Sequence, residues 1–344
     1  MKELILQPIT EEIKPKSDSL IGRFTVGDVD TINERFGLMF SKRNIEPFSP
    51  AEIQNLKSLE AQFPYTFYAP NTKGIFTEYV SNETVDYREY NFFDLAIYNR
   101  SKSKTLYCFP FPHIEHRANL KFFQTLVDTI EDMNIVFILG NKAIFPQLRS
   151  NENEVTTGMI DQELTGLISG LIAEMESDYI ILNSTCFGHL LSHSIIPLFD
   201  KLISYSPMVV KSNFFTLDVD DVTFTGKHFP IIDFFHLFNI AQNRRALLAP
   251  IPLCLDVIDW NLYKQYYAMF RTGKFTSSKG DNVLIHTPED KIVSLPDNDF
   301  EKWSKIITLE SPQGIGLHGA NFVFPDSISE YVNIIHEESN NAGM

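Results

Sequence analysis

A cysteine in the middle of the chain lies in a pattern that could support covalent chemistry. Residues 184–188 read Ser-Thr-Cys-Phe-Gly, with small residues two before and two after the cysteine. The same spacing, with serine at the centre, marks a nucleophile elbow, a sharp turn from a strand into a helix. The apolar run 179–182 predicts a buried strand, and the apolar segment 190–196 predicts a helix that ends near Pro197. Cys186 is therefore a candidate nucleophile, and the other interpretation is a buried cysteine that only packs.

Two later loops supply groups that could assist this thiol. A thiol attacks a carbonyl carbon as thiolate, which a helix N-terminus and a neighbouring imidazole both favour. A second apolar strand, residues 282–286, precedes Asp290. A third strand, residues 305–309, precedes a glycine-containing loop that carries His318. Nucleophile, acid and histidine therefore follow one another in the chain, each in the loop after its own strand.

With this order and placement, the chain resembles the α/β-hydrolase superfamily over residues 78–337. The resemblance rests on the elbow around Cys186, on an Asp-x-Ile-Val pattern that begins at Asp290, and on His318 in its small-residue loop. It implies a triad in which Cys186 is the nucleophile, His318 is the general base and Asp290 orients the imidazole.

Three departures from the superfamily pattern lie in the elbow. Cysteine replaces serine at position 186, and Ser184 replaces the first glycine. His189 stands where a second small residue often follows.

The resemblance also implies an oxyanion hole formed by two backbone N–H groups. One is the N–H of Phe187, directly after the nucleophile. The other comes from the loop after the strand at residues 105–109, which in the superfamily commonly carries a His-Gly motif. Here residues 109–113 read Phe-Pro-Phe-Pro-His, with prolines in place of the glycine. Because proline has no N–H, the second donor must be His113 or a residue after it.

A Cys-His-Asp triad would form a thioester acyl-enzyme, which water, amines, thiols or alcohols can cleave. We therefore expect an acyl-transfer enzyme, an ester or thioester hydrolase or an acyltransferase, that acts on a small acyl substrate with an apolar part. The acid could instead be Glu289 or one of Asp218, Asp220 and Asp221. The alternative function is a non-catalytic α/β-hydrolase-fold protein that binds a small apolar ligand or a protein partner. The missing glycine in the oxyanion loop favours that alternative.

Alternating strands and helices must position these residues. Continuous apolar runs predict strands, and apolar residues three or four apart predict helices. The expected strands are residues 75–80, 90–98, 105–109, 134–140, 179–182, 201–207, 282–286 and 305–309, and the expected core helices are residues 119–130, 160–175 and 327–336. Asp326 or Ser327 is the expected cap of the last helix. The alternation predicts an α/β fold with a mostly parallel central sheet and helices on both faces.

The other segments are predicted to lie outside this core. Residues 1–75 form an expected N-terminal extension, in which a capping box at residues 49–52 starts a helix. Residues 76–210 and 281–338 form the expected hydrolase-like core. Residues 211–280 are longer than an ordinary connection in such a fold, and their aromatic residues at helical spacing predict a helical cap or lid.

Composition narrows the class of partner. The 344 residues carry a formal net charge of −15, which disfavours nucleic acid or an anionic membrane surface as the main partner. Cys108, Cys186 and Cys254 show neither disulfide nor metal spacing, and no P-loop, dinucleotide or zinc motif is present. We therefore expect no cofactor and no metal. With no apolar run of membrane-spanning or signal-peptide length, we expect a cytoplasmic protein; its oligomeric state stays open.

Overall fold

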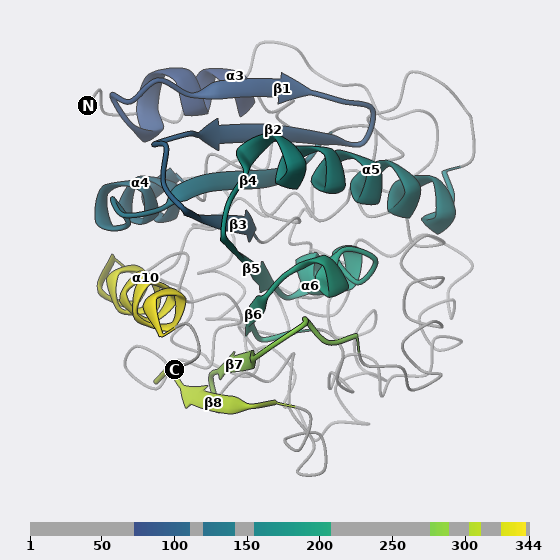
Figure 1. Ribbon diagram of the computed structural model, residues 1–344. Coiled ribbons are helices and arrows are strands. Elements are labelled where there is room, and N and C mark those ends of the chain that lie inside the picture. The colour runs from purple at the N-terminus through teal and green to yellow at the C-terminus, as the bar shows by residue number, and fades with distance from the viewer. Residues whose placement is uncertain are drawn as a thin grey trace, which may run out of the picture.

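An eight-stranded sheet forms the centre of the computed structural model (Figure 1). The structure describes residues 72–110, 120–141, 155–207, 276–288, 303–310 and 325–341. The strands are β1 (Asp86–Glu89), β2 (Phe93–Tyr98), β3 (Lys104–Phe109), β4 (Asn134–Gly140), β5 (Tyr179–Thr185), β6 (Lys201–Tyr205), β7 (Asn282–His286) and β8 (Lys305–Thr308). Their order across the sheet is β1-β2-β4-β3-β5-β6-β7-β8.

Most neighbouring strands of this sheet run parallel. Among the described strands, only β2 is antiparallel to its neighbours, β1 and β4, whereas the pairs from β4 through β3, β5, β6 and β7 to β8 are all parallel. Every residue of β4 and β6 is buried, as expected for parallel strands that are covered on both faces. The predicted mostly parallel sheet is confirmed.

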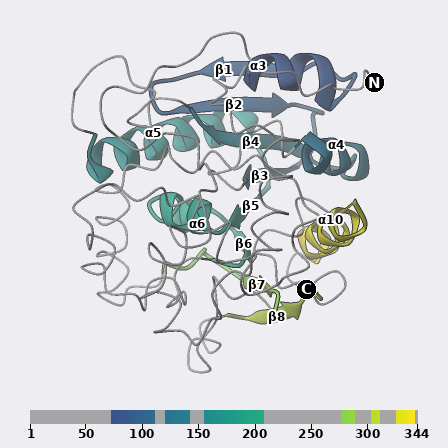
Figure 2. The same ribbon diagram turned by 180° about the vertical axis from the view of Figure 1, so that it is seen from behind.

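The helices cover the sheet on two sides. The helices of the described residues are α3 (Thr72–Ile75), the π-helix η1 (Phe76–Val80), α4 (Leu120–Thr129), α5 (Thr157–Met175), α6 (Phe187–Leu191), the 3₁₀-helix η4 (Ile196–Leu198) and α10 (Pro325–Asn340). Helices α4 and α10 lie on one side of the sheet and α5 and α6 on the other (Figures 1 and 2). Phe122 of α4 stacks on Tyr331 of α10, with ring centroids 5.7 Å apart. The predicted fold class is therefore confirmed for its sheet and covering helices.

Helix α5 illustrates why the core helices form where the sequence predicts them. Its buried residues, Ile160, Leu164, Ile168 and Leu171, recur at intervals of three or four and line one face. The side chain of Thr156 accepts a hydrogen bond from the Met159 N–H and caps the first turn. Helix α5 leads directly into β5, the strand before Cys186.

Several predicted elements have other bounds in the structure, and three of them differ in their type, extent or cap. The sequence predicts a strand at residues 75–80, but residues 76–80 form η1, because Phe76 and Val80 are four apart and a helical turn buries both. The helix after the elbow is predicted at residues 190–196, but α6 begins at Phe187 and ends at Leu191. Helix α10 begins at Pro325, which suits a first helical position, so Asp326 and Ser327 lie inside the helix and do not cap it.

Several other predictions fall outside the described residues. They concern the N-terminal extension up to residue 71 and the cap from residue 211 to residue 275. Within the part of the chain that the structure describes, no helix is both long enough and apolar enough to cross a membrane.

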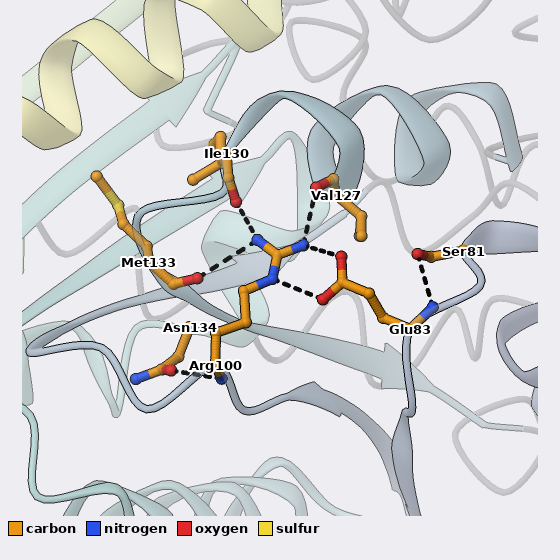
Figure 3. Close-up of polar contacts among 7 residues, drawn as sticks. All are labelled: Ser81, Glu83, Arg100, Val127, Ile130, Met133 and Asn134. Carbon is orange, nitrogen blue, oxygen red and sulfur yellow. Dashed lines mark hydrogen bonds and ion pairs between the residues drawn. The ribbon is translucent and has the colours of Figure 1, made fainter.

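Arg100 fixes the end of α4, the helix that follows the loop with the expected second oxyanion donor (Figure 3). Its guanidinium donates to the carbonyl oxygens of Val127 at 2.9 Å and of Met133 at 3.4 Å, and also to that of Ile130. The same group donates to both carboxylate oxygens of Glu83, at 2.7 and 2.5 Å. A cation at this position satisfies carbonyls that a helix C-terminus otherwise leaves unpaired.

Candidate active site

The turn between β5 and α6 places Cys186 in a strained backbone conformation. Its φ is 49° and its ψ is −120°, a region that residues with a side chain rarely occupy. The Cys186 N–H donates to the Tyr205 carbonyl oxygen at 3.0 Å, and the His189 N–H donates to the Cys186 carbonyl oxygen at 3.1 Å. The predicted sharp strand-to-helix turn is therefore present, and hydrogen bonds hold it on both sides. Strain of this kind gathers at functional sites, where the surrounding structure must maintain it.

Gly188 brings the elbow against the end of β3. A Cβ atom at this position would lie 3.0 Å from both the Cδ1 atom and the carbonyl oxygen of Phe109, and 3.1 Å from the Pro110 carbonyl oxygen. Such distances are shorter than ordinary van der Waals contacts, so any larger residue at this position would force its neighbours to shift. The glycine of the elbow motif thus lets the nucleophile turn approach the loop from which the second oxyanion donor is expected.

A buried polar cluster lies beneath the elbow on the α6 side of the sheet. The Nδ1 atom of His189 lies 2.7 Å from the Ser204 Oγ atom and 3.1 Å from the Ser184 Oγ atom. The two serine hydroxyls are 2.8 Å apart. Burial, followed by the charge of His193, lowers the pKa of His189 to about 3, so its imidazole is neutral at neutral pH. Two departures from the superfamily pattern, Ser184 and His189, therefore bind each other.

A second buried network lies on the opposite face of β5. The Asn183 side chain donates to the Tyr331 hydroxyl of α10 at 3.0 Å, and the Thr185 hydroxyl lies 3.4 Å from the same oxygen. The Cys108 thiol donates to Asn183 at 3.4 Å. Burial raises the pKa of the Cys108 thiol far above its ordinary value, so this cysteine is a neutral structural thiol.

The structure describes only part of the predicted site. Cys186 follows β5 and is 2% exposed, and Phe187 is the first residue of α6. His318, Asp290 and His113 lie outside the described residues, as do the alternative acids Glu289, Asp218, Asp220 and Asp221. The triad and the second oxyanion donor therefore stay predictions.

Sequence reasoning missed the polar networks that support the elbow. Ser204 lies fifteen residues after His189, and Tyr331 lies 148 residues after Asn183. The only signal for the first cluster was the pair of polar residues, Ser184 and His189, at positions where small residues are usual.

Comparisons with known proteins identify the fold. No protein-family model matches the chain, and no curated protein matches its sequence. Among solved structures, a soluble variant of monoglyceride lipase from Saccharomyces cerevisiae aligns with a TM-score of 0.50 and 9% identity, over 82% of this chain and 99% of that chain. A membrane phospholipase A, described as a bacterial virulence factor, aligns with a TM-score of 0.50 and 12% identity, over 90% and 100%.

These alignments and the strand order give the same assignment. The sheet, its single antiparallel strand β2 among the parallel strands and the strained turn after β5 define an α/β-hydrolase fold. The chain has this fold, and the resemblance drawn from its sequence is confirmed at that level.

Proposed function

We propose that this protein is an acyl-transfer enzyme, an ester or thioester hydrolase or an acyltransferase, with Cys186 as its nucleophile. The observation that carries the proposal is the conformation of Cys186, with φ 49° and ψ −120°, at the strand-to-helix turn. A buried cysteine that only packs needs no such backbone strain, whereas a nucleophile elbow does. The networks on both faces of β5 and the close contact at Gly188 support the same turn.

The topology of the sheet supports His318 and Asp290 as the partners of Cys186. Strands β5, β7 and β8 run parallel, so the loops that follow them leave the same edge of the sheet. Asp290 comes four residues after the end of β7, and His318 comes ten residues after the end of β8. Two strand spacings, about 10 Å, separate β5 from β7, and four extended residues span about 13 Å. The loops are therefore long enough to bring all three residues together.

In the proposed mechanism, His318 takes the proton of the Cys186 thiol. The thiolate attacks the acyl carbonyl carbon and forms a carbon–sulfur bond, while the carbonyl oxygen becomes an oxyanion. The N–H of Phe187 and a second N–H from the loop of His113 bind this oxyanion, and the loss of one such donor costs about 3 kcal/mol in transition-state stabilisation.

Collapse of the tetrahedral intermediate breaks the bond to the leaving group. His318 returns its proton to the leaving alcohol or thiol, and Asp290 holds the imidazole in the required tautomer. The remaining thioester on Cys186 is then cleaved by water, which gives hydrolysis, or by an amine, thiol or alcohol, which gives acyl transfer.

The substrate class follows from the chemistry and from the proteins that share the fold. The two solved structures are named as a monoglyceride lipase and a phospholipase A, so an ester with an apolar acyl part is the natural first substrate. A second candidate function is binding of a small apolar ligand or a protein partner without catalysis. The burial of Cys186, which is 2% exposed, favours that candidate.

Selective alkylation separates the two candidates. Iodoacetamide at neutral pH, followed by peptide mass mapping, should label Cys186 faster than Cys108. Cys108 serves as the internal control, because it is fully buried and its thiol pKa is raised by that burial. In the enzyme, His318→Ala should abolish the selectivity, since His318 removes the thiol proton. Labelling of Cys186 no faster than of Cys108 would support binding without catalysis.

A further inference from the structure

Ser206, the residue after β6, combines backbone strain with a buried hydroxyl. Its φ is 41°, in the left-handed region that a residue with a side chain adopts at a cost. The residue is 1% exposed, and its Oγ atom has no hydrogen-bond partner among the residues that the structure describes. The left-handed backbone lowers the stability of the folded chain. The buried hydroxyl lowers it as well, because without a partner it loses its hydrogen bonds to water.

Ser206 and Cys186 occupy equivalent positions at the same edge of the sheet. Thr185 pairs with Tyr205 in the parallel register of β5 and β6, so the residues that directly follow the two strands are Cys186 and Ser206. The Ser206 N–H donates to the Ile285 carbonyl oxygen of β7 at 2.9 Å, just as the Cys186 N–H donates to that of Tyr205. Adjacent strands are about 4.8 Å apart, and a substrate that reaches the buried sulfur therefore comes within reach of Ser206.

Two other serine hydroxyls in the described residues serve as comparisons for Ser206. Ser204, two residues earlier in β6, is also fully buried, but its hydroxyl bonds to His189 and Ser184. Ser339 has a buried hydroxyl without a partner among the described residues, but it lies near the end of α10. Its neighbour Glu338 bonds to Lys201, the first residue of β6, so Ser339 is at the opposite edge of the sheet from Cys186.

We propose that the Ser206 hydroxyl contacts the substrate, and that it selects acyl groups which carry a hydrogen-bonding group near the reacting carbonyl. This inference rests on the proposed acyl transfer at Cys186. A polar group two or three bonds from the carbonyl carbon, such as a 3-hydroxyl, would lie beside β6 while the carbonyl lies at Cys186. The Ser206 hydroxyl then forms its hydrogen bond only when such a substrate is bound. This explains why it has no hydrogen-bond partner among the described residues.

The first test is the stability of serine-to-alanine variants, measured by urea unfolding. Ser206→Ala should raise the urea midpoint or leave it unchanged, because the variant removes a buried hydroxyl that no described residue binds. Ser339→Ala should behave in the same way. Ser204→Ala should lower the midpoint, because it breaks the bonds to His189 and Ser184. A fall for Ser206→Ala as large as that for Ser204→Ala would mean that the Ser206 hydroxyl has a structural partner, and would overturn the proposal.

The second test is substrate discrimination, measured as the rate of acyl-enzyme formation by intact mass. The probes are the N-acetylcysteamine thioesters of butyric acid and 3-hydroxybutyric acid. Ser206→Ala should reduce the preference for the 3-hydroxy substrate threefold to tenfold, roughly 0.6–1.4 kcal/mol, as expected for one neutral hydrogen bond. Ser339→Ala should keep the wild-type preference. An unchanged preference in Ser206→Ala would refute the role of Ser206 alone, whereas no acylation of the wild type by either thioester would refute the proposed function and this inference with it.

Discussion

Replacing Gly188 with alanine probes the contact between the elbow and the end of β3. The new methyl group would lie 3.0 Å from the Phe109 carbonyl oxygen and 3.1 Å from the Pro110 carbonyl oxygen, and backbone atoms cannot rotate away as a side chain can. Overpacking of this kind costs about 1–3 kcal/mol. Alanine recovers up to about 1 kcal/mol through its helix propensity. We therefore expect Gly188→Ala to lower the free energy of unfolding by about 1–2 kcal/mol.

Gly166→Ala provides the matched control. Gly166 lies within α5, is exposed, and has no neighbouring atom within 4 Å of the position that a Cβ would take. There the same substitution should raise the free energy of unfolding by about 0.5–1 kcal/mol. Equilibrium urea unfolding of both variants against the wild type measures the two effects, and their signs should be opposite.

Gly188→Ala should also impair acylation of Cys186. The methyl group would force the elbow and the end of β3 apart. A displacement of about 1 Å in a catalytic site can cost about 100-fold in rate, so the smaller shift expected here should cost less than that. If Gly188→Ala proves as stable as Gly166→Ala, the elbow does not press against Phe109 and Pro110, and this contact does not hold the turn in place.

Three further predictions concern buried polar and charged groups. The pKa of His189 is about 3 in the folded chain and about 6.5 in the unfolded chain, so the free energy of unfolding should fall as the pH drops from 6.5 toward 3. The fall should be up to about 1.4 kcal/mol per pH unit. In urea unfolding of His189→Asn at several pH values, this contribution to the pH dependence should be absent. Arg100→Gln should lower the free energy of unfolding by about 2–3 kcal/mol. Arg88 forms its ion pairs at the surface, so Arg88→Gln should lower it by less than about 1 kcal/mol. Glu338→Gln removes the carboxylate beside the buried Lys201 ammonium and should cost about 3 kcal/mol, with partial recovery in the Lys201→Met double variant.

The buried strands were the part of the fold that could be predicted most closely from sequence. Residues 134–140 and 282–286 were predicted as strands, and β4 and β7 have those bounds. Both are short apolar runs in a chain that alternates strands with helices, and such runs fit a parallel sheet covered on both faces. By contrast, β1 (Asp86–Glu89) was not predicted, since its polar residues at the sheet edge show no apolar period.

The elbow was predictable as a turn but not in its supporting contacts. The spacing of Ser184, Cys186 and Gly188 indicated a close approach of strand and helix, and the contact of Gly188 with Phe109 has that origin. The bonds of His189 to Ser204 join residues on different elements, and a sequence does not specify such pairs. The strain and burial of Ser206 also depend on how β6 packs in the folded sheet, so the sequence gave no signal for them.

The most direct test of the central claim is the mass of the intact protein after incubation with short- and medium-chain thioesters. The wild type should gain the mass of the acyl group, located on Cys186 by peptide mapping. Cys186→Ala should fold and gain no mass, because it removes only the sulfur that forms the thioester. Faster loss of the acyl group with an added amine or alcohol than with water would identify a transferase. If Cys186→Ala turns over a thioester at the wild-type rate, or if the acyl group is found on another residue, Cys186 is not the nucleophile.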